Sequence, residues 1–180
     1  DLHSFPTRRS SDLPNKEVRQ EFLNSIQGQE FQTVNNAIHR SDKLLQLTLA
    51  QNAEKVAEML QEVHSDNCSV IQYNDENSLS CTINLALYFA REYYTIIREL
   101  PTGKGYADIC YIPRKLYADK PAIVVELKWD KTAEGAIAQI KEKQYVNALK
   151  EYRGNLLLAG INYDRETKKH YCIIEKLIME

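Results

Sequence analysis

Asp108, Glu126 and Lys128 are the residues of this sequence whose types and spacing could do chemistry. Glu126 and Lys128 are one residue apart in a run of β-forming residues, 122–129, and alternate side chains of a strand share one face. Asp108 lies in a second such run and can lie opposite Glu126, about 5 Å away at the Cβ atoms, if the two runs pair. Two carboxylates at that distance repel each other, so one takes up a proton or a cation sits between them. Hard carboxylate oxygens suit Mg²⁺ or Mn²⁺.

This arrangement suits the hydrolysis of a phosphodiester bond. A metal ion held by two carboxylates polarises a non-bridging oxygen, lowers the pKa of a bound water and offsets the developing charge. Lys128 would orient that water or stabilise the pentacovalent phosphorus centre, with an electrostatic role ahead of a role as base. A salt bridge on the solvent side of a sheet explains the same spacing, because Glu-x-Lys is short and built from common residues.

The neighbouring segments predict how these residues are positioned. Helices are expected from Leu79 to about Glu92, after the cap residues 74–78, and from Ala133 to about residue 151. Short turns make the first three strands antiparallel, and the second helix is a crossover that places the fourth strand parallel to the third. The prediction is an α/β fold with an αβββαβ core and a mixed central sheet. Strands are expected at 93–100, 106–112, 122–129, 156–161 and 171–174.

A short all-helical segment, residues 14–66, is expected to precede this core. Apolar residues recur at helical intervals over 33–38 and then without interruption over 41–63. The segment shows no catalytic spacing. His39 and His64 have no second ligand nearby and are predicted to be surface histidines.

The composition excludes several classes of protein. An apolar fraction of 43% and a charged fraction of 27% are those of a globular protein and not of a disordered one. A net charge of −2 gives no overall sign of a polyanionic partner. No apolar run approaches the roughly 18–20 residues that span a bilayer, so no membrane association is expected. The cysteines are far apart and form no Cys-x-x-Cys pair, which favours reduced thiols and a cytoplasmic location: Cys68, Cys81, Cys110 and Cys172.

Residues 1–13 are expected not to be native. Their sequence, DLHSFPTRRSSDL, is residue for residue the translation of a short-read sequencing adapter, and a natural disordered tail is the alternative. Native sequence would then begin near Pro14, as a fragment whose upstream region is missing. The expected divisions of the chain are 1–13, 14–66 and 67–180.

Several stretches carry a resemblance to a known family: Gly103–Asp108, Ile123–Trp129, Ala138–Tyr145, Gly160–Asp164 and Lys168–His170. Together they resemble the PD-(D/E)XK nuclease superfamily, and most of all the nuclease-like domain at the C-terminus of bacterial AAA-ATPase-like proteins. The resemblance covers about residues 70–178. It implies a restriction-endonuclease-like fold and metal-dependent cleavage of nucleic acid.

The resemblance also implies roles for individual residues. In the superfamily, the acidic residue of the second strand and the Glu-x-Lys pair hold the metal and act on the phosphate. Asp108 and Glu126 would therefore bind Mg²⁺ or Mn²⁺, and Lys128 would act with them in catalysis. A glutamate on the first core helix often joins the metal site, and Glu76 matches it. The residue before Asp108 is Ala107 and not the proline of the superfamily's name, a position where members vary.

Two residues of the following helix are further catalytic candidates. A glutamine there often assists catalysis, and Gln139 matches it, with a plain solvent-facing residue as the alternative. Relatives place a tyrosine four residues later, whereas Tyr145 follows Gln139 by six, which turns the two about 120° out of line on a helix. Core packing is the alternative for Tyr145.

The function implied by the resemblance is a nuclease that acts on nucleic acid, with DNA ahead of RNA. Residues 14–66 resemble the end of the ATPase-like region of those proteins. The chain has no Gly-rich phosphate loop, so an ATPase-like partner domain is expected upstream. The alternative is a catalytically silent binding or regulatory module of a larger AAA-ATPase-like protein. The complete set of Asp108, Glu126 and Lys128 favours the nuclease.

Overall fold

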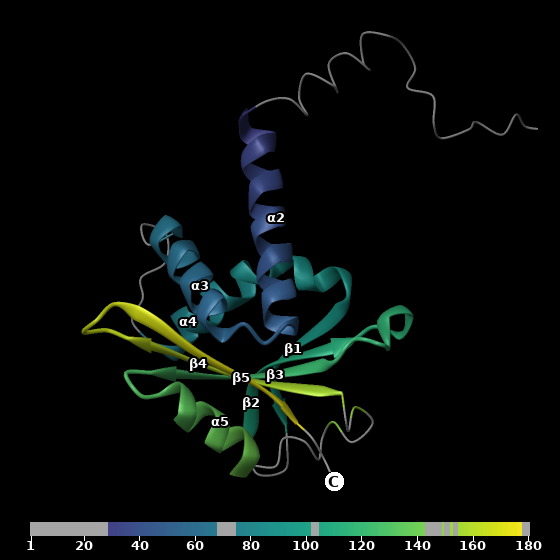
Figure 1. Ribbon diagram of the computed structural model, residues 1–180, viewed down its shortest axis with the longest axis vertical. Coiled ribbons are helices and arrows are strands. Elements are labelled where there is room, and N and C mark those ends of the chain that lie inside the picture. The colour runs from purple at the N-terminus through teal and green to yellow at the C-terminus, as the bar shows by residue number, and fades with distance from the viewer. Residues whose placement is uncertain are drawn as a thin grey trace, which may run out of the picture. The chain divides into compact units, whose positions relative to one another are not determined.

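The computed structural model describes residues 29–67, 75–101, 105–142, 149, 152 and 155–177. The chain divides into two compact units, residues 1–39 and 40–180. The first unit contains the beginning of α2, and the site lies entirely within the second. The described elements, in chain order, are α2 (Gln29–Leu49), α3 (Ala53–Asn67), α4 (Glu76–Ala86), the 3₁₀ helix η1 (Tyr88–Glu92), β1 (Tyr94–Pro101), β2 (Tyr106–Pro113), the 3₁₀ helix η2 (Lys115–Tyr117), β3 (Ala122–Trp129), α5 (Ala133–Glu142), β4 (Leu156–Asp164) and β5 (Lys169–Leu177) (Figure 1).

Five strands form one mixed sheet in the order β1-β2-β3-β4-β5. The pairs β1–β2, β2–β3 and β4–β5 are antiparallel, and the pair β3–β4 is parallel. The chain crosses from β3 to β4 through α5, because parallel neighbours need a crossover connection. The predicted αβββαβ order, with a mixed sheet and preceding helices, is confirmed.

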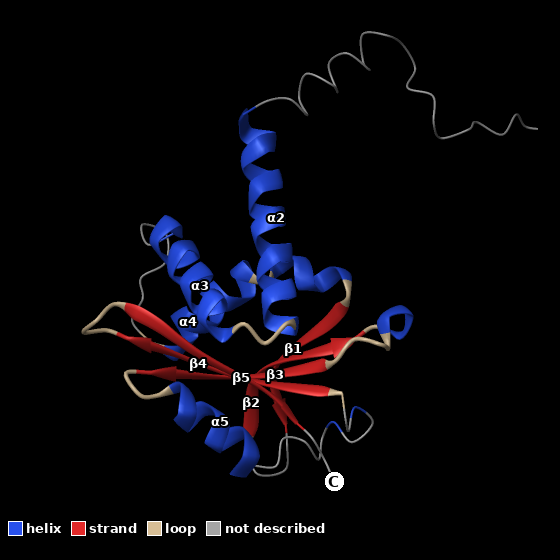
Figure 2. Cartoon of the chain, viewed as in Figure 1, coloured by secondary structure: helices blue, strands red, loops and turns tan. Residues whose placement is uncertain are grey.

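The central strand β3 is covered on both faces. Ile123, Val125 and Leu127 pack into a core cluster that includes side chains of α3 and α4. Ala122 and Val124 point the other way, into a second cluster with α5. Figure 2 shows α3 and α4 on one side of the sheet and α5 on the other. A strand buried on both faces reads as a continuous apolar run, which makes a charged residue inside it conspicuous.

The helix expected over 41–63 is broken, and this prediction was wrong. Gln51 has a left-handed φ of 58°, and its N–H donates to the Thr48 carbonyl while that of Asn52 donates to Leu47. This pair of bonds is the usual way of closing a helix with a left-handed residue. Asn52 then caps the beginning of α3, because its side chain accepts from the N–H of Lys55.

Two other helices differ in extent from the prediction. α4 begins at Glu76, among the expected cap residues, because Asp75 caps it by accepting from the Ser78 N–H at 2.8 Å. It ends at Ala86, and η1 occupies the rest of the expected helix. α5 is described as far as Glu142, and residues 143–148 of its expected extension lie outside the described residues. None of the described helices has the length and hydropathy needed to cross a membrane.

Candidate active site

Glu126 and Lys128 form a buried ion pair on the face of β3 that α5 covers. Lys128 Nζ lies 3.1 Å from Glu126 Oε1, and the two residues are 8% and 1% exposed. A salt bridge on the solvent side of the sheet is therefore excluded. Burying two charges costs several kcal/mol per ion in lost hydration, so such a pair is weak evidence for stability. The burial points to a role for the charges themselves.

Gln139 brings α5 into the same arrangement. Its Nε2 donates to Glu126 Oε1, the oxygen that Lys128 also contacts, and its side chain is half-buried. The solvent-facing alternative for Gln139 is therefore excluded. α5 can reach this position because Gly160 on β4 has no side chain: a Cβ there would lie 2.5 Å from the Ala133 carbonyl oxygen.

Asp108 occupies the point where β2 and β3 stop pairing. The last partners of this ladder are Ile109 and Val125, and the same register would place Asp108 opposite Glu126. The Asp108 carboxylate still links β2 to β3 beyond the last backbone pair, because its Oδ2 accepts from the backbone N–H of Leu127 at 2.7 Å. A side chain therefore replaces a backbone acceptor, and this bond fixes the position of one carboxylate oxygen.

At Asp108 the regular alternation of side chains between the two faces of β2 is broken. Ala107 packs into the cluster beneath α5, whereas Ile109 packs into the opposite cluster, although residues two apart on a regular strand share a face. On β1, Glu99 has a left-handed φ of 52° between residues paired with Ala107 and Ile109. The pairing register is the same on both sides of Glu99, so no residue is inserted and the irregularity is a local change in the twist of β1 beside Asp108. It allows the Asp108 side chain to point along the sheet towards β3.

The pKa of the buried Cys110 thiol is affected by the two carboxylates of this region. Burial, together with the nearby Glu126 and Asp108 carboxylates, raises its pKa to about 12. Both carboxylates are thus close enough to act on one buried group. The thiol stays protonated and neutral, and it is no candidate nucleophile.

A family model described as the PD-(D/E)XK nuclease superfamily matches residues 74–172, more than half of the chain. The chain belongs to the PD-(D/E)XK nuclease superfamily. The matched region contains α4, all of β1 to β4, α5 and the beginning of β5. No curated protein matches the chain. The narrower resemblance to domains of AAA-ATPase-like proteins remains a prediction.

Glu76, assigned to the metal site from the resemblance to this superfamily, is not brought to the other candidate residues. Glu76 opens α4, which packs on the other face of the sheet, and its closest ion-pair partner is Lys131 at 4.0 Å. Among the described residues, no three His, Cys, Asp or Glu side chains form a group able to hold a metal, so Glu76 does not complete one with Asp108 and Glu126. Tyr145 lies outside the described residues. Both assignments remain predictions.

Asn162 is a site residue that the sequence reasoning did not single out. It is 2% exposed, lies beside Lys128 in the β3–β4 register, and accepts from the Lys131 N–H at 3.0 Å. The neighbouring N–H of Asp130 donates to the Tyr163 carbonyl. These bonds fix the end of β3 next to Lys128. The sequence feature that could have pointed to Asn162 is its polar side chain in the otherwise apolar run LLLAGIN.

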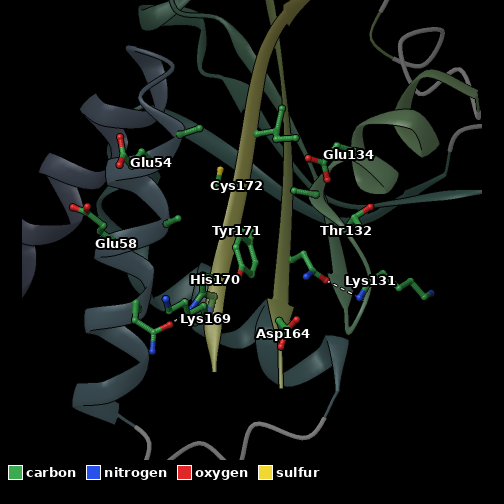
Figure 3. Close-up of a pocket in the computed structure, with 16 residues that line it drawn as sticks. Glu54, Glu58, Lys131, Thr132, Glu134, Asp164, Lys169, His170, Tyr171 and Cys172 are labelled. Carbon is green, nitrogen blue, oxygen red and sulfur yellow. Dashed lines mark hydrogen bonds between the residues drawn. The ribbon is translucent and has the colours of Figure 1, made fainter. Parts of the chain in front are cut away.

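A cavity of about 770 Å³ lies beside the site and shares only Asn162 with it among the site residues discussed above. Residues of α3, β4, β5 and the start of α5 line it, and Figure 3 shows Glu54 and Glu58 on one side and Glu134 on the other. None of Asp108, Glu126, Lys128 and Gln139 lines this cavity. Four carboxylates and two lysines line it, so its excess of negative charge is unfavourable for a phosphate, and we do not take it as the substrate site.

His64 is not the surface histidine expected from the sequence. It is half-buried, and its ring meets those of Tyr163 and His170 edge-on at 5.2 and 5.4 Å. Burial lowers the pKa of His64, and burial together with His64 lowers that of His170 to about 3. The prediction failed because the cluster is assembled from α3, β4 and β5, which are far apart in the sequence.

Proposed function

We propose that this chain is a divalent-metal-dependent nuclease that hydrolyses phosphodiester bonds, with DNA as the preferred substrate. The supporting observation is the buried Glu126–Lys128 pair, which Gln139 contacts and which lies beside Asp108 at the end of the β2–β3 ladder. Membership of the PD-(D/E)XK nuclease superfamily gives this arrangement a chemical context.

Asp108 and Glu126 would hold the metal ion. Their carboxylates are hard oxygen donors, which fit Mg²⁺ or Mn²⁺ and no softer metal. Mg²⁺ commonly binds to one or two carboxylates and keeps several waters, so two protein ligands are an ordinary number for it. A cation there would supply a Lewis acid for the phosphate and lower the pKa of an attacking water.

The protein's own groups prepare the site for a phosphate. Lys128 carries a positive charge on a largely buried stem, and its ammonium can donate to a phosphate oxygen as negative charge develops. Gln139 holds the Glu126 carboxylate in one orientation, and the Leu127 N–H does the same for Asp108. Groups held in advance need no reorganisation during the reaction, which is where electrostatic catalysis gains its advantage.

The test is Mn²⁺-dependent cleavage of plasmid and single-stranded DNA and of RNA. Glu126→Gln should fold and lose cleavage, because it keeps the shape of the side chain and removes the charge that a cation needs. Glu175→Gln is the matched control, since Glu175 forms an exposed ion pair with Lys141 on β5 and α5. Full activity of Glu126→Gln would contradict the proposal. Binding of nucleic acid without cleavage by the native protein would instead support the catalytically silent module.

A further inference from the structure

A second surface suited to nucleic acid lies at the end of the sheet opposite the candidate active site. It is formed by residues 88–93 and 114–120, which contain η1 and η2 and are called the aromatic–basic patch below. The Arg114 N–H donates to the Tyr93 carbonyl at 2.9 Å, and the Tyr93 and Tyr117 rings meet edge-on at 4.9 Å. The two segments therefore form one continuous surface.

The patch is distinct from the active site. Tyr94 pairs with Pro113 where β1 begins and β2 ends, so both segments lie beyond that end of the sheet. Asp108 is five residues away along β2, which corresponds to about 17 Å of strand. One phosphate cannot contact both places.

The patch is basic in a chain that is acidic overall. It contains four basic and two acidic residues, whereas the chain has a net charge of −2. Among the described residues, the ion pairs involve none of Arg91, Arg114 and Lys115, and all three of these side chains are exposed. Their charge is available to an anionic partner.

Aromatic rings accompany these charges. Tyr88 is 59% exposed, and the Arg91 guanidinium lies over its ring at 5.4 Å from the centroid. Lys120 lies over the Tyr93 ring at 4.7 Å. Exposed rings that alternate with cations are the features by which proteins hold single strands: bases stack on the rings, and the cations follow the backbone.

We propose that the aromatic–basic patch binds single-stranded nucleic acid, with a base stacked on Tyr88 and phosphates near Arg91 and Lys115. Unpaired bases are required because the bases of a duplex are stacked on each other and cannot reach a protein ring. The site would hold a strand remote from the point of cleavage. It does not depend on the proposed catalysis.

The test is fluorescence anisotropy with labelled oligothymidylate in EDTA, where no cleavage can occur. Tyr88→Ala should weaken binding by about tenfold or more, and Tyr88→Phe should retain it, because the phenyl ring still stacks. Lys115→Ala should reduce the slope of log K against log salt by about 0.7, the value for one phosphate contact on a single strand. Duplex DNA of the same length should bind less tightly than the single strand.

The controls are Tyr171→Ala and Lys176→Ala, which remove an exposed ring and an exposed cation from β5. Both should bind like the native protein. The proposal is wrong if native protein does not bind oligothymidylate, if the controls weaken binding as much as the patch variants, or if Tyr88→Phe behaves like Tyr88→Ala. It is also wrong if Tyr88→Ala changes the oligomeric state in sedimentation and leaves binding intact, since the patch would then be a protein interface. If the native protein binds oligothymidylate as expected but does not cleave plasmid, only the proposed nuclease function is contradicted, and the proposal for the patch stands.

Discussion

Replacing Lys128 by methionine removes the cation of the buried pair and keeps a long apolar stem in its place. Glu126 is 1% exposed, so water cannot take over from the lost ammonium. Removing one partner of a buried ion pair costs about 3–5 kcal/mol, because the other charge is left uncompensated. Gln139 still donates to the same oxygen, which favours the lower end of that range.

The expected loss is therefore about 3 kcal/mol in the metal-free protein. For a folded unit of this size, each kcal/mol lowers the melting temperature by about 3–4 °C, so the variant should melt about 10 °C below the native protein. Mn²⁺ held by Asp108 and Glu126 would compensate the carboxylate, and most of the difference should then disappear. Cleavage should stay roughly two to three orders of magnitude below the native rate even with metal, because the charge that faces the phosphate is gone.

The assay is a thermal melt in EDTA and in Mn²⁺, with cleavage measured on the same samples. Lys141→Met is the matched control: Lys141 and Glu175 are 2.6 Å apart, with side chains about half exposed, and an exposed pair contributes about 0–1 kcal/mol. The double variant Glu126→Gln/Lys128→Met completes a double-mutant cycle. It should be more stable than Lys128→Met alone, since no buried charge remains.

Three results would contradict this prediction, two for stability and one for cleavage. An unchanged melting temperature of Lys128→Met in EDTA would show that the pair is solvated and not buried. A double variant less stable than Lys128→Met would show that the two charges do not compensate each other. If Lys128→Met cleaves at the native rate, the description of the fold still holds, but Lys128 has no part in the mechanism.

Three further predictions concern neighbouring groups. Gly160→Ala should destabilise the protein by about 1–3 kcal/mol in urea unfolding, because its Cβ would meet the Ala133 carbonyl at 2.5 Å. Asp108→Asn should fold normally, since an amide oxygen can still accept from the Leu127 N–H, but calorimetry should show that its heat of Mn²⁺ binding is lost. His170, whose pKa is lowered to about 3, stays neutral when folded and takes up a proton near pH 6.5 when unfolded. Its contribution should therefore make the free energy of unfolding fall by about 1.4 kcal/mol per pH unit as the pH drops from about 6.5 towards 3.

Each of these has a control within the chain. Gly135→Ala is the control for Gly160→Ala, since a Cβ at Gly135 would meet only the Thr132 hydroxyl at 3.1 Å. If both variants lose the same free energy of unfolding, the close packing of α5 on Gly160 does not cause the loss. Asp164→Asn is the control for Asp108→Asn. If Asp108→Asn keeps the native heat of Mn²⁺ binding, Asp108 is not a ligand of the metal site. His170→Gln should flatten the pH dependence, whereas His39→Gln, at an exposed position, should not.

The order of strands was predictable because local chemistry determines it. Pro101 and Pro113 end runs of β-forming residues, and the short connections between them leave only antiparallel pairing. The break between α2 and α3 was not predictable in this way. The apolar spacing continues through it, and the left-handed residue is Gln51, which gives no signal of the kind that a glycine would give.

The site was predictable in part for a similar reason. The period of a strand puts Glu126 and Lys128 on one face, but both faces of β3 are apolar, so the sequence could not show which face α5 covers. The broken alternation at Asp108 depends on the left-handed Glu99 of the neighbouring strand. Ala107 and Ile109 are both apolar, and their sequence alone does not reveal that they point to opposite sides.

The bond from the Leu127 amide to Asp108 makes one backbone proton a spectroscopic reporter of the site. An amide that donates to a charged carboxylate forms a stronger bond than one that donates to a neutral carbonyl. Its proton resonance and its rate of exchange with solvent therefore follow the charge on Asp108, whether that charge is altered by acid or by a bound cation. A titration by NMR on isotope-labelled protein would read the occupancy of the site from the main chain of β3, without a substrate.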